Sequence, residues 1–510
     1  MGATVKMTNG NGATRRSVDD AVWSACDILR RSNCAGALQY VPELSWLLFL
    51  RILDEREARE AEEAEAFGQP FTPSLEAPYR WRDWAAPDAP KRTELAERGA
   101  MNAFKGFVDR ELLPHLRSLR DQPGATPRQK VIGEMLVGTE RTRVDTERNL
   151  LDVLDRIDAI DVTGDDYADL FPLSQVYEGL LLKMGEKGND GGQFFTPREI
   201  IRAVVKAIAP KPSETVYDPG CGTGGFLIEA FKHMRRNLPE DAIGSELAAI
   251  GQSRLYGREK ENLIFPIALA NMVLHGIDAP KLWHGNTLSG QETYGGLWEN
   301  APALFDVVLT NPPFGGKENA DVQTRFDYRT SATQILFLQE IMNSLKPGGR
   351  CGMVVDEGVM FRTNERAFVQ TKRRLLDSCD LWAVVSLPPG VFTATGAGVK
   401  TNLLFFTRGK PTESVWYYDL SDRKVTKKKP LLLADFDDFF RLLPDRAESE
   451  RSWTVTREEL DRRGLDLKAV NPNRKAEVDT RTPAQILDEI EAHGRELDKA
   501  LSELRALIPG

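Results

Sequence analysis

The chain has 510 residues, of which 41% are hydrophobic and 28% charged, and its formal net charge is −9. This length exceeds one ordinary hydrophobic core, so two or three domains are expected, and no apolar stretch is long enough to span a membrane. The acidic balance argues against a protein that grips nucleic acid by itself, while five scattered cysteines without C-x-x-C spacing favour a cytoplasmic location, reduced thiols and no metal site.

The first 165 residues predict a tail followed by a helical domain. Residues 1–15 are rich in Gly, Asn and Thr, and they are expected to form a flexible tail rather than a signal peptide. Residues 16–165 are expected to fold as an N-terminal helical domain, because apolar residues such as Val22, Ala25 and Leu29 recur at helical spacing.

Two stretches of this helical domain carry more specific expectations. The charged run at residues 54–65 is expected to form a solvated helix surface. Trp81 and Trp84 fall in a proline-rich stretch, which is expected to be a long and irregular connector.

Strand and helix patterns alternate from about residue 166 to residue 475. This alternation predicts an α/β domain with a doubly wound, mostly parallel sheet and helices on both faces. A turn is expected where Lys-Pro-Gly-Gly stands at residues 346–349. The strand candidates are residues 215–217, 305–310, 352–355, 381–387 and 402–407.

The segment at residues 191–200 predicts the start of a helix near the beginning of this domain. Thr196 is expected to be the N-cap and Pro197 to occupy the first turn. An apolar face then continues through Ile201 and Val204.

A glycine-rich turn follows the first strand candidate. Residues 218–226 read DPGCGTGGF, and glycines permit positive φ and let a ligand approach the backbone closely. Such a loop resembles the dinucleotide fingerprint only weakly. The carboxylate of Asp218 would repel a pyrophosphate, so it favours a cationic ligand, such as the sulfonium and amino groups of S-adenosylmethionine.

The most informative stretch is Asn-Pro-Pro-Phe at residues 311–314, which closes the strand at residues 305–310. Two consecutive prolines cannot continue a central strand, so the backbone must leave the sheet there. Open α/β sheets bind ligands beyond the carboxyl ends of their strands. The amide of Asn311, a carbonyl beside a rigid turn and the ring of Phe314 suit a planar nitrogen base whose exocyclic amine must be held.

The C-terminal segment at residues 476–510 predicts an amphipathic helix with a narrow apolar stripe, suited to a coiled-coil seam. The polar, proline-marked stretch at residues 471–483 favours a projecting arm, and packing of the helix onto its own protein is the alternative. The apolar positions are Ile486, Ile490, Leu497, Leu501 and Leu504.

Three motifs together resemble the modification subunit of type I restriction–modification systems, a gamma-type N6-adenine DNA methyltransferase. They are QFFTPRE at residues 193–199, the glycine turn at 218–226 and NPPF at 311–314. The resemblance covers most of the chain, including GVKTNLLFF at residues 398–406. It implies a class I S-adenosylmethionine-dependent methyltransferase fold, which is Rossmann-like, with one antiparallel strand at residues 402–407.

The resemblance also implies which residues bind the cofactor S-adenosylmethionine. Asp218 and the glycines would form the methionine-side turn, with Phe194 and Thr196 closing over it. Glu259, after a weak strand pattern, is our choice for the ribose hydroxyls, a surface glutamate being the alternative. Asn286 stands where the family often has an acidic residue, and it could bond the cofactor's adenine. The full set is Gln193, Phe194, Phe195, Thr196, Asp218, Gly220, Gly222, Thr223, Gly224, Glu259 and Asn286.

For catalysis, the expectation is direct methyl transfer to N6 of adenine in DNA without a metal. The expected catalytic residues are Asn311, Pro312, Pro313 and Phe314. The Asn311 side-chain oxygen and the Pro312 carbonyl would accept hydrogen bonds from the exocyclic amine. Phe314 would stack on the base, which must be flipped out of the duplex.

The implied partners are double-stranded DNA and a separate specificity subunit that recognises the target, in a ratio of two modification subunits to one specificity subunit. A restriction nuclease or translocase subunit is a further candidate. The C-terminal helix would dock on helices of the specificity subunit. The net charge implies that local basic clusters form one stripe or that another subunit supplies most phosphate contacts.

Three alternatives stay open at this point. A nicotinamide-dependent oxidoreductase would explain the glycine loop but not Asn-Pro-Pro-Phe. A methyltransferase could act on another planar nitrogen, in a ribosomal RNA base or a protein glutamine. A non-catalytic scaffold of a DNA complex would bind the cofactor without turnover.

Overall fold

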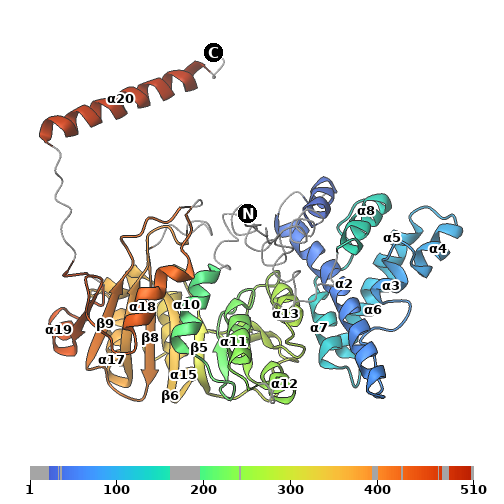
Figure 1. Cartoon of the computed structure of the whole chain (residues 1–510), viewed down its shortest axis with the longest axis horizontal. Coiled ribbons are helices and arrows are strands. Elements are labelled where there is room, and N and C mark those ends of the chain that lie inside the picture. The colour runs from blue at the N-terminus through green and yellow to red at the C-terminus, as the bar shows by residue number, and fades with distance from the viewer. Residues whose placement is uncertain are drawn as a thin grey trace, which may run out of the picture.

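The computed structural model describes residues 22–32, 34, 37–160, 196–239, 243–392, 400–426, 429–468, 470–473 and 482–506. The expected tail at residues 1–15 and the site residues Gln193, Phe194 and Phe195 lie outside the described residues. Figure 1 shows a group of N-terminal helices beside a broad sheet, and a C-terminal helix that stands apart from both.

The described strands form one mixed sheet of ten, in the order β10-β9-β7-β8-β6-β5-β1-β2-β3-β4. The central strands β3, β2, β1, β5 and β6 pair in parallel. Their neighbour β8 runs antiparallel between β6 and β7, which confirms the antiparallel strand expected at residues 402–407. The bounds are β1 (Val216–Asp218), β2 (Leu255–Glu259), β3 (Lys281–Asn286), β4 (Gln291–Tyr294), β5 (Phe305–Thr310), β6 (Leu345–Asp356), β7 (Cys379–Ser386), β8 (Thr401–Arg408), β9 (Ser414–Asp419) and β10 (Ser452–Thr456).

Helices cover both faces of this sheet, because its strands are apolar on both sides. In β5, Val307 and Leu309 join the core cluster that contains α10 and α11, whereas Val308 joins the cluster that contains α15 and α17. The doubly wound α/β fold predicted from the sequence is therefore confirmed. The helices are α10 (Arg198–Ile208), α11 (Gly225–Arg236), α12 (Ile243–Ser253), α13 (Phe265–Leu274), α14 (Ala320–Gln323), α15 (Thr333–Ser344), α16 (Glu357–Phe361), α17 (Arg366–Ser378), α18 (Asp437–Leu442) and α19 (Arg457–Arg462), with the short turn η6 (Leu433–Phe436).

The turn expected at residues 346–349 is wrong, because these residues lie within β6. The pairing of β5 with β6 jumps from Phe305 opposite Leu345 to Val307 opposite Arg350. The intervening residues bulge out of the ladder, with Gly348 at a φ of +79°. The sequence Lys-Pro-Gly-Gly, which is typical of turns, therefore forms a bulge inside the long strand β6 and not a turn before a strand.

The N-terminal part is helical, as expected, and it packs around its own apolar residues. Val22, Ala25 and Leu29 are fully buried in a helix at residues 22–31. The other elements are α2 (Ala37–Ala66), α3 (Trp81–Trp84), α4 (Pro90–Glu97), α5 (Ala103–Phe107), η1 (Val108–Leu112), α6 (Leu113–Ser118), η2 (Leu119–Asp121), α7 (Pro127–Met135) and α8 (Glu147–Asp158).

The irregular connector expected around Trp81 and Trp84 is wrong. Both indoles are buried, and they form the short helix α3. The Trp81 ring nitrogen donates a hydrogen bond of 2.7 Å to Asp158 at the end of α8. Two large aromatic side chains therefore anchor this segment in the core, which its prolines did not suggest.

The charged run at residues 54–65 is helical within α2 but not simply solvated. Glu57 is buried and accepts a hydrogen bond from the backbone of Ser74. Arg56 and Glu60 form ion pairs that link α2 to neighbouring elements. The helix α13 is apolar on all sides, is buried at almost every position and contacts both α2 and α7.

The five cysteines are free and buried, which agrees with the expectation of reduced thiols. Within the part of the chain that the structure describes, helices are too short or too polar to cross a bilayer.

Candidate active site

A cavity of about 210 Å³ lies at the carboxyl edge of the central strands. Four adjacent strands present a polar residue there: Asp218 ends β1, Glu259 ends β2, Asn286 ends β3, and Asn311 follows β5 directly. All four line the cavity. The strands are parallel, so their carboxyl ends meet, and the sheet thereby gathers residues that are far apart in the sequence.

The glycine turn between β1 and α11 forms one wall. Gly222 and Gly224 have φ values of +52° and +80°, conformations that a residue with a Cβ adopts only at a cost. The Gly220 backbone N–H donates to the carboxylate of Asp218 at 3.1 Å. The helix α13 also holds the turn, since the Asn271 side-chain amide donates a hydrogen bond of 2.8 Å to the carbonyl of Thr223.

Glu259 holds this turn from the neighbouring strand. Its carboxylate accepts hydrogen bonds from the backbone N–H groups of Gly222, Lys260 and Glu261 at 2.8–2.9 Å. The side chain is only 7% exposed, so the alternative of a surface glutamate is wrong. Gly257, two residues earlier, lets side chains of β3 and α11 pack close to β2, because a Cβ there would lie 2.7 Å from the Leu282 side chain and 2.9 Å from the Leu227 side chain.

The two buried carboxyl groups, those of Asp218 and Glu259, are weaker acids than usual, because their pKa values are raised. Burial raises the pKa of Asp218 to about 7, and the nearby charge of Glu259 adds to the rise. Burial likewise raises the pKa of Glu259 to about 7, against the lowering effect of its three backbone hydrogen bonds. Strongly shifted carboxyl groups in a cleft are typical of functional sites, and a cationic ligand would favour their charged forms.

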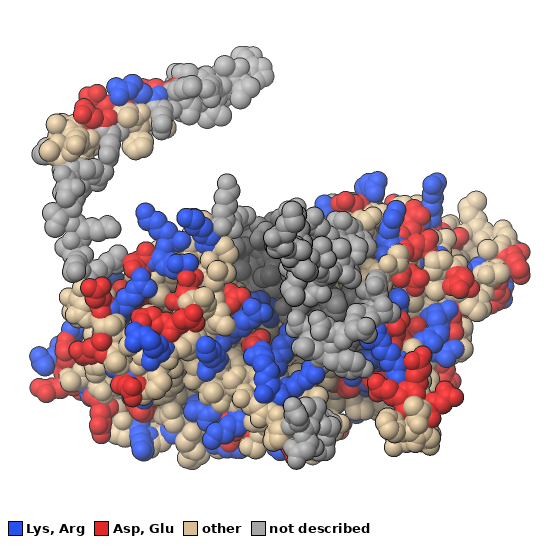
Figure 2. Space-filling model, viewed as in Figure 1, with Lys and Arg blue, Asp and Glu red and all other residues tan. Residues whose placement is uncertain are grey.

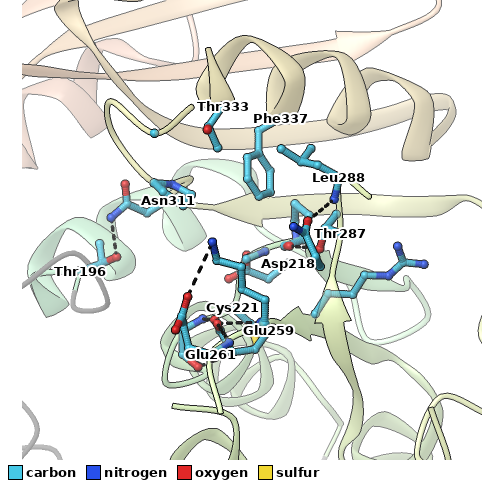
Figure 3. Close-up of a pocket in the computed structure, with 18 of the residues that line it drawn as sticks. Thr196, Asp218, Cys221, Glu259, Glu261, Thr287, Leu288, Asn311, Thr333 and Phe337 are labelled. Carbon is cyan, nitrogen blue, oxygen red and sulfur yellow. Dashed lines mark hydrogen bonds and ion pairs between the residues drawn. The ribbon is translucent and has the colours of Figure 1, made fainter. Parts of the chain in front are cut away.

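The Asn-Pro-Pro-Phe corner forms the opposite side of the cavity. The Asn311 amide nitrogen donates a hydrogen bond of 2.9 Å to the hydroxyl of Thr196. The Asn311 side-chain oxygen is buried and has no hydrogen-bond partner among the described residues. Such an oxygen is an acceptor available to a ligand. Figure 3 shows Asn311 and Thr196 side by side at this end of the pocket.

The remaining residues of the corner are divided between the pocket and the core. Pro313 and Phe314 line the cavity, whereas Pro312 is buried and is not among the lining residues. The ring of Phe314 meets that of Phe392 edge to face at 5.7 Å. An aromatic contact therefore fixes the Phe314 ring beside the cavity.

The expectation that Thr196 caps a helix is wrong. The N-cap of α10 is Pro197, and no side chain caps this helix. The Thr196 hydroxyl instead accepts the hydrogen bond from Asn311, across 115 residues of sequence. Thr196 lines the cavity, and the hydrogen bond that its side chain makes there is with Asn311 of the Asn-Pro-Pro-Phe corner.

Asn286 lines the cavity from the end of β3. Its side-chain oxygen accepts hydrogen bonds from the backbone of Leu288 and Ser289, at 2.9 and 3.3 Å. The neighbouring Thr287 hydroxyl donates to the carbonyl of Pro219 at 2.6 Å, which ties this strand end to the glycine turn. The amide oxygen of Asn286 is thus occupied, and its amide nitrogen is the group left to meet a ligand.

Sequence reasoning missed the wall that α15 supplies. Thr333 and Phe337 line the cavity one helical turn apart, and Figure 3 shows Phe337 pointing from its helix into the pocket. The Thr333 hydroxyl donates to the carboxylate of Glu318 at 3.0 Å. Residues four apart share a helix face, but the sequence carries no sign of which face meets the pocket.

Within the described residues, no three His, Cys, Asp or Glu side chains are arranged to hold a metal ion. The cavity offers two buried carboxyl groups, an acceptor oxygen without a partner in the described part of the chain and a glycine turn that admits close approach. This set fits a ligand that carries positive charge beside a planar base bearing an amine.

Comparison with known proteins gives consistent matches over the whole fold. Residues 168–480 match the family model described as N-6 DNA Methylase, and residues 18–130 match the HsdM N-terminal domain. The type I restriction enzyme EcoEI methylase subunit of Escherichia coli is 31% identical, over 96% of this chain and 98% of that protein.

Two solved structures extend this similarity to three dimensions. A chain solved in work on complex assembly and conformational transition of the type I R-M system is 38% identical, with a TM-score of 0.73 over 97% of this chain and 98% of that one. A modification subunit of a type I restriction enzyme from Vibrio vulnificus YJ016 is 31% identical, with a TM-score of 0.76 over 92% of this chain and 99% of that one.

Proposed function

This chain belongs to the N-6 DNA methylase family, as a modification subunit of a type I restriction–modification system, and on that premise we propose how its pocket performs methyl transfer. The chain is an adenine-specific DNA methyltransferase. Family membership leaves the nicotinamide-dependent oxidoreductase without support. In the proposed mechanism, the residues of the pocket are divided between the methyl donor and the base that receives the methyl group.

We assign the cofactor S-adenosylmethionine to the side of the cavity formed by the glycine turn. Bound there, it supplies a methyl group already activated by a positively charged sulfur. The carboxylates of Asp218 and Glu259 would hold its cationic and hydroxyl groups, and Asn286 would contact its base. Gly220, Gly222, Thr223 and Gly224 provide the backbone cradle, and the expected roles of Gln193, Phe194 and Phe195 remain part of this proposal.

The single observation that carries the catalytic assignment is the Asn311 side-chain oxygen, which is buried and has no hydrogen-bond partner among the described residues. The exocyclic nitrogen of adenine is a poor nucleophile, because its lone pair is delocalised into the ring. Hydrogen bonds accepted by the Asn311 oxygen and the Pro312 carbonyl would favour a more tetrahedral nitrogen with its lone pair aimed at the methyl group. The Asn311 amide is held by its hydrogen bond to Thr196 before the substrate arrives, and groups placed in advance in this way usually contribute most to catalysis.

Phe314 would stack on the adenine, which has to leave the duplex to enter the cavity. Pro313 would shape the corner, since its ring fixes the backbone beside the pocket. Placement of the two reactants in one cavity would supply the rest of the acceleration.

The assembly we propose follows the expected partners. Residues 16–165 would form the N-terminal helical domain, residues 166–475 the methyltransferase domain, and residues 476–510 an arm that docks on a specificity subunit. Two modification subunits would join one specificity subunit on double-stranded DNA, with a restriction nuclease or translocase subunit as a further partner. Figure 2 shows acidic and basic side chains interspersed on the visible face, which suits a chain that shares its DNA contacts with another subunit.

An Asn311→Ala variant tests the catalytic assignment. The chain, copurified with its specificity subunit, is given DNA and S-adenosylmethionine with a labelled methyl group, and N6-methyladenine is measured after digestion. Methyl transfer should fall by at least about 100-fold, while isothermal titration should find cofactor affinity within about 2-fold of the parent.

An Asn237→Ala variant is the matched control, because Asn237 is exposed at the far end of α11. It should transfer methyl groups like the parent. Unchanged turnover in Asn311→Ala would remove the acceptor role, and cofactor binding without any turnover in the parent complex would favour the scaffold alternative.

A further inference from the structure

The hydrogen bond between Asn311 and Thr196 bears on which end of the Asn311 amide faces the reacting base. An asparagine amide has a donor end and an acceptor end of nearly equal size. In this structure the donor end points to the Thr196 hydroxyl at 2.9 Å, and the acceptor end is buried without a partner among the described residues. In this arrangement the Thr196 hydroxyl acts as the acceptor for the amide nitrogen, and the amide oxygen is the end left for another donor.

The Thr196 hydroxyl is available for this contact because it has no helix to cap. Threonine at a helix start usually accepts a hydrogen bond from the backbone of the first turn. Here Pro197 is the N-cap of α10, and no side-chain cap is present. The oxygen of Thr196 is thereby left to accept the hydrogen bond from Asn311.

We propose that Thr196 is a positioning residue, which sets the Asn311 amide so that its oxygen faces the exocyclic amine of the target adenine. This inference rests on the proposed function. With the amide reversed, an NH₂ group would face an NH₂ group, so two donors would meet and the acceptor would be lost. The exocyclic amine would donate its hydrogen bond to the Asn311 oxygen. The Asn311 nitrogen then needs an acceptor of its own, and the Thr196 hydroxyl is that acceptor.

This role differs from the cofactor contact expected of Thr196. A cofactor contact would act on the affinity for S-adenosylmethionine and would be independent of Asn311. A positioning role acts on turnover, and it operates only while the Asn311 amide is present. Residues that act through one another show non-additive effects, so the two roles separate in a double-mutant cycle.

The test compares Thr196→Val, which keeps the shape but removes the hydroxyl, with Thr196→Ser, which keeps the hydroxyl. Both are made in the complex with the specificity subunit, and kcat, KM for DNA and the Kd of S-adenosylmethionine are measured. Thr196→Val should lower kcat by roughly 10- to 100-fold with the cofactor Kd within about 2-fold. Thr196→Ser should restore kcat to within about 3-fold of the parent.

In the Asn311→Ala background, adding Thr196→Val should lower kcat by less than about 2-fold further. A Thr456→Val variant serves as the control, because it removes a hydroxyl from the start of α19 and lies far from the cavity in sequence and fold. Should Thr196→Val fail to fold, as judged by its thermal midpoint, Thr196→Ala takes its place.

Three results would overturn the inference: unchanged kcat in Thr196→Val, a weakened cofactor Kd with kcat intact at saturating cofactor, or independent losses in the double variant. Failure of the underlying function is a separate outcome, since it would appear as full methyl transfer by Asn311→Ala alone.

Discussion

The carboxyl groups of Asp218 and Glu259 lie at the ends of two neighbouring strands, both buried against the same glycine turn. In the folded chain without a cation nearby, burial raises the pKa of each to about 7. Their ordinary values are 3.8 and 4.5. Between pH 4 and pH 7 the folded chain therefore holds protons that the unfolded chain has released.

This difference in bound protons fixes the sign of two pH effects. Stability falls with rising pH wherever the folded state binds more protons than the unfolded state, so these two groups favour folding most below their unfolded pKa values. A bound cation favours the ionised forms instead. Affinity for S-adenosylmethionine should consequently rise over the same range in which the ligand-free chain loses stability.

The affinity for the cofactor should therefore depend on pH. Isothermal titration should give a Kd for S-adenosylmethionine at least about 10-fold weaker at pH 6 than at pH 8, because a carboxyl group with a pKa near 7 is mostly protonated at the lower pH. Asp218→Asn should weaken binding at pH 8 and flatten this dependence. A pH dependence equal in parent and variant would assign it to other groups.

The residues of the site differ in how far the sequence could identify them. Asp218 and Asn311 each follow a recognisable strand, and a parallel sheet brings strand ends together, so their meeting was predictable. The contact between Thr196 and Asn311 was not, because it depends on where α10 begins relative to β5. Phe337 was also missed, since a buried phenylalanine on a helix has the same sequence pattern in a pocket wall as in a core.

Among the elements, most strands that the sequence analysis predicted are rich in apolar residues. The sequence indicated β1, β5, β6, β7 and β8, and only weakly β2. The sequence analysis proposed neither β9, although it is apolar and buried, nor β10. It did not propose β3 and β4 either, which are short and mix charged, aromatic and small residues. Such strands form because neighbouring strands pair with them, and that pairing is a tertiary effect that overrides weak local propensity.

The C-terminal helix α20 (Pro483–Ala506) shows an apolar stripe facing solvent. Leu487, Ile490 and Leu497 are each about 60% exposed, and in Figure 1 the helix stands away from the sheet and the N-terminal helices. Exposed apolar side chains at spacings of three and seven suit burial against another helix. Packing of α20 onto its own chain, the alternative from the sequence, is not the arrangement in this structure.

The prediction for this element is a selective loss of assembly. A chain lacking residues 483–510 should no longer copurify with the specificity subunit, because the apolar stripe that would bury against it is gone. Its thermal midpoint and its Kd for S-adenosylmethionine should match those of the parent. Changing Leu487 and Ile490 together to Asp is the finer test, and an intact complex from either variant would exclude this helix as the docking arm.

At the scale of the whole molecule, ion pairs join the N-terminal helices to the methyltransferase fold. Arg128 of α7 contacts Glu60 of α2 at 2.6 Å and Asp278, which follows α13, at 2.9 Å. Arg56 of α2 contacts Asp278 at 2.6 Å and the carbonyl of Val273 at 3.2 Å. Beside them the apolar helix α13 is buried against α2 and α7. The N-terminal helices and the methyltransferase fold are thus connected by an apolar contact of α13 with α2 and α7 and by ion pairs beside it.

This arrangement makes the orientation of the helices depend on a few partly buried charges. The side chain of Arg128 is 16% exposed and that of Asp278 is 35% exposed. Exposed ion pairs contribute little, but removing one partner of a shielded network leaves the other charges without compensation. Arg128 pairs with three carboxylates, those of Glu57, Glu60 and Asp278, so its loss should matter more than the loss of any one of these acids.

Arg128→Ala should therefore lower the free energy of unfolding by about 1–3 kcal/mol, seen as an earlier transition in differential scanning calorimetry. The transition of the N-terminal helices should begin to separate from that of the sheet, because their coupling is weakened.

Arg82→Ala is the matched control: Arg82 pairs with Asp54 within the N-terminal helices and is 47% exposed, so its loss should change stability by less than about 1 kcal/mol. In a cycle with Asp278→Asn, the two changes should be non-additive by at least about 0.5 kcal/mol. Additive effects, or equal losses in Arg128→Ala and Arg82→Ala, would mean that the apolar surface of α13 alone holds the two parts together.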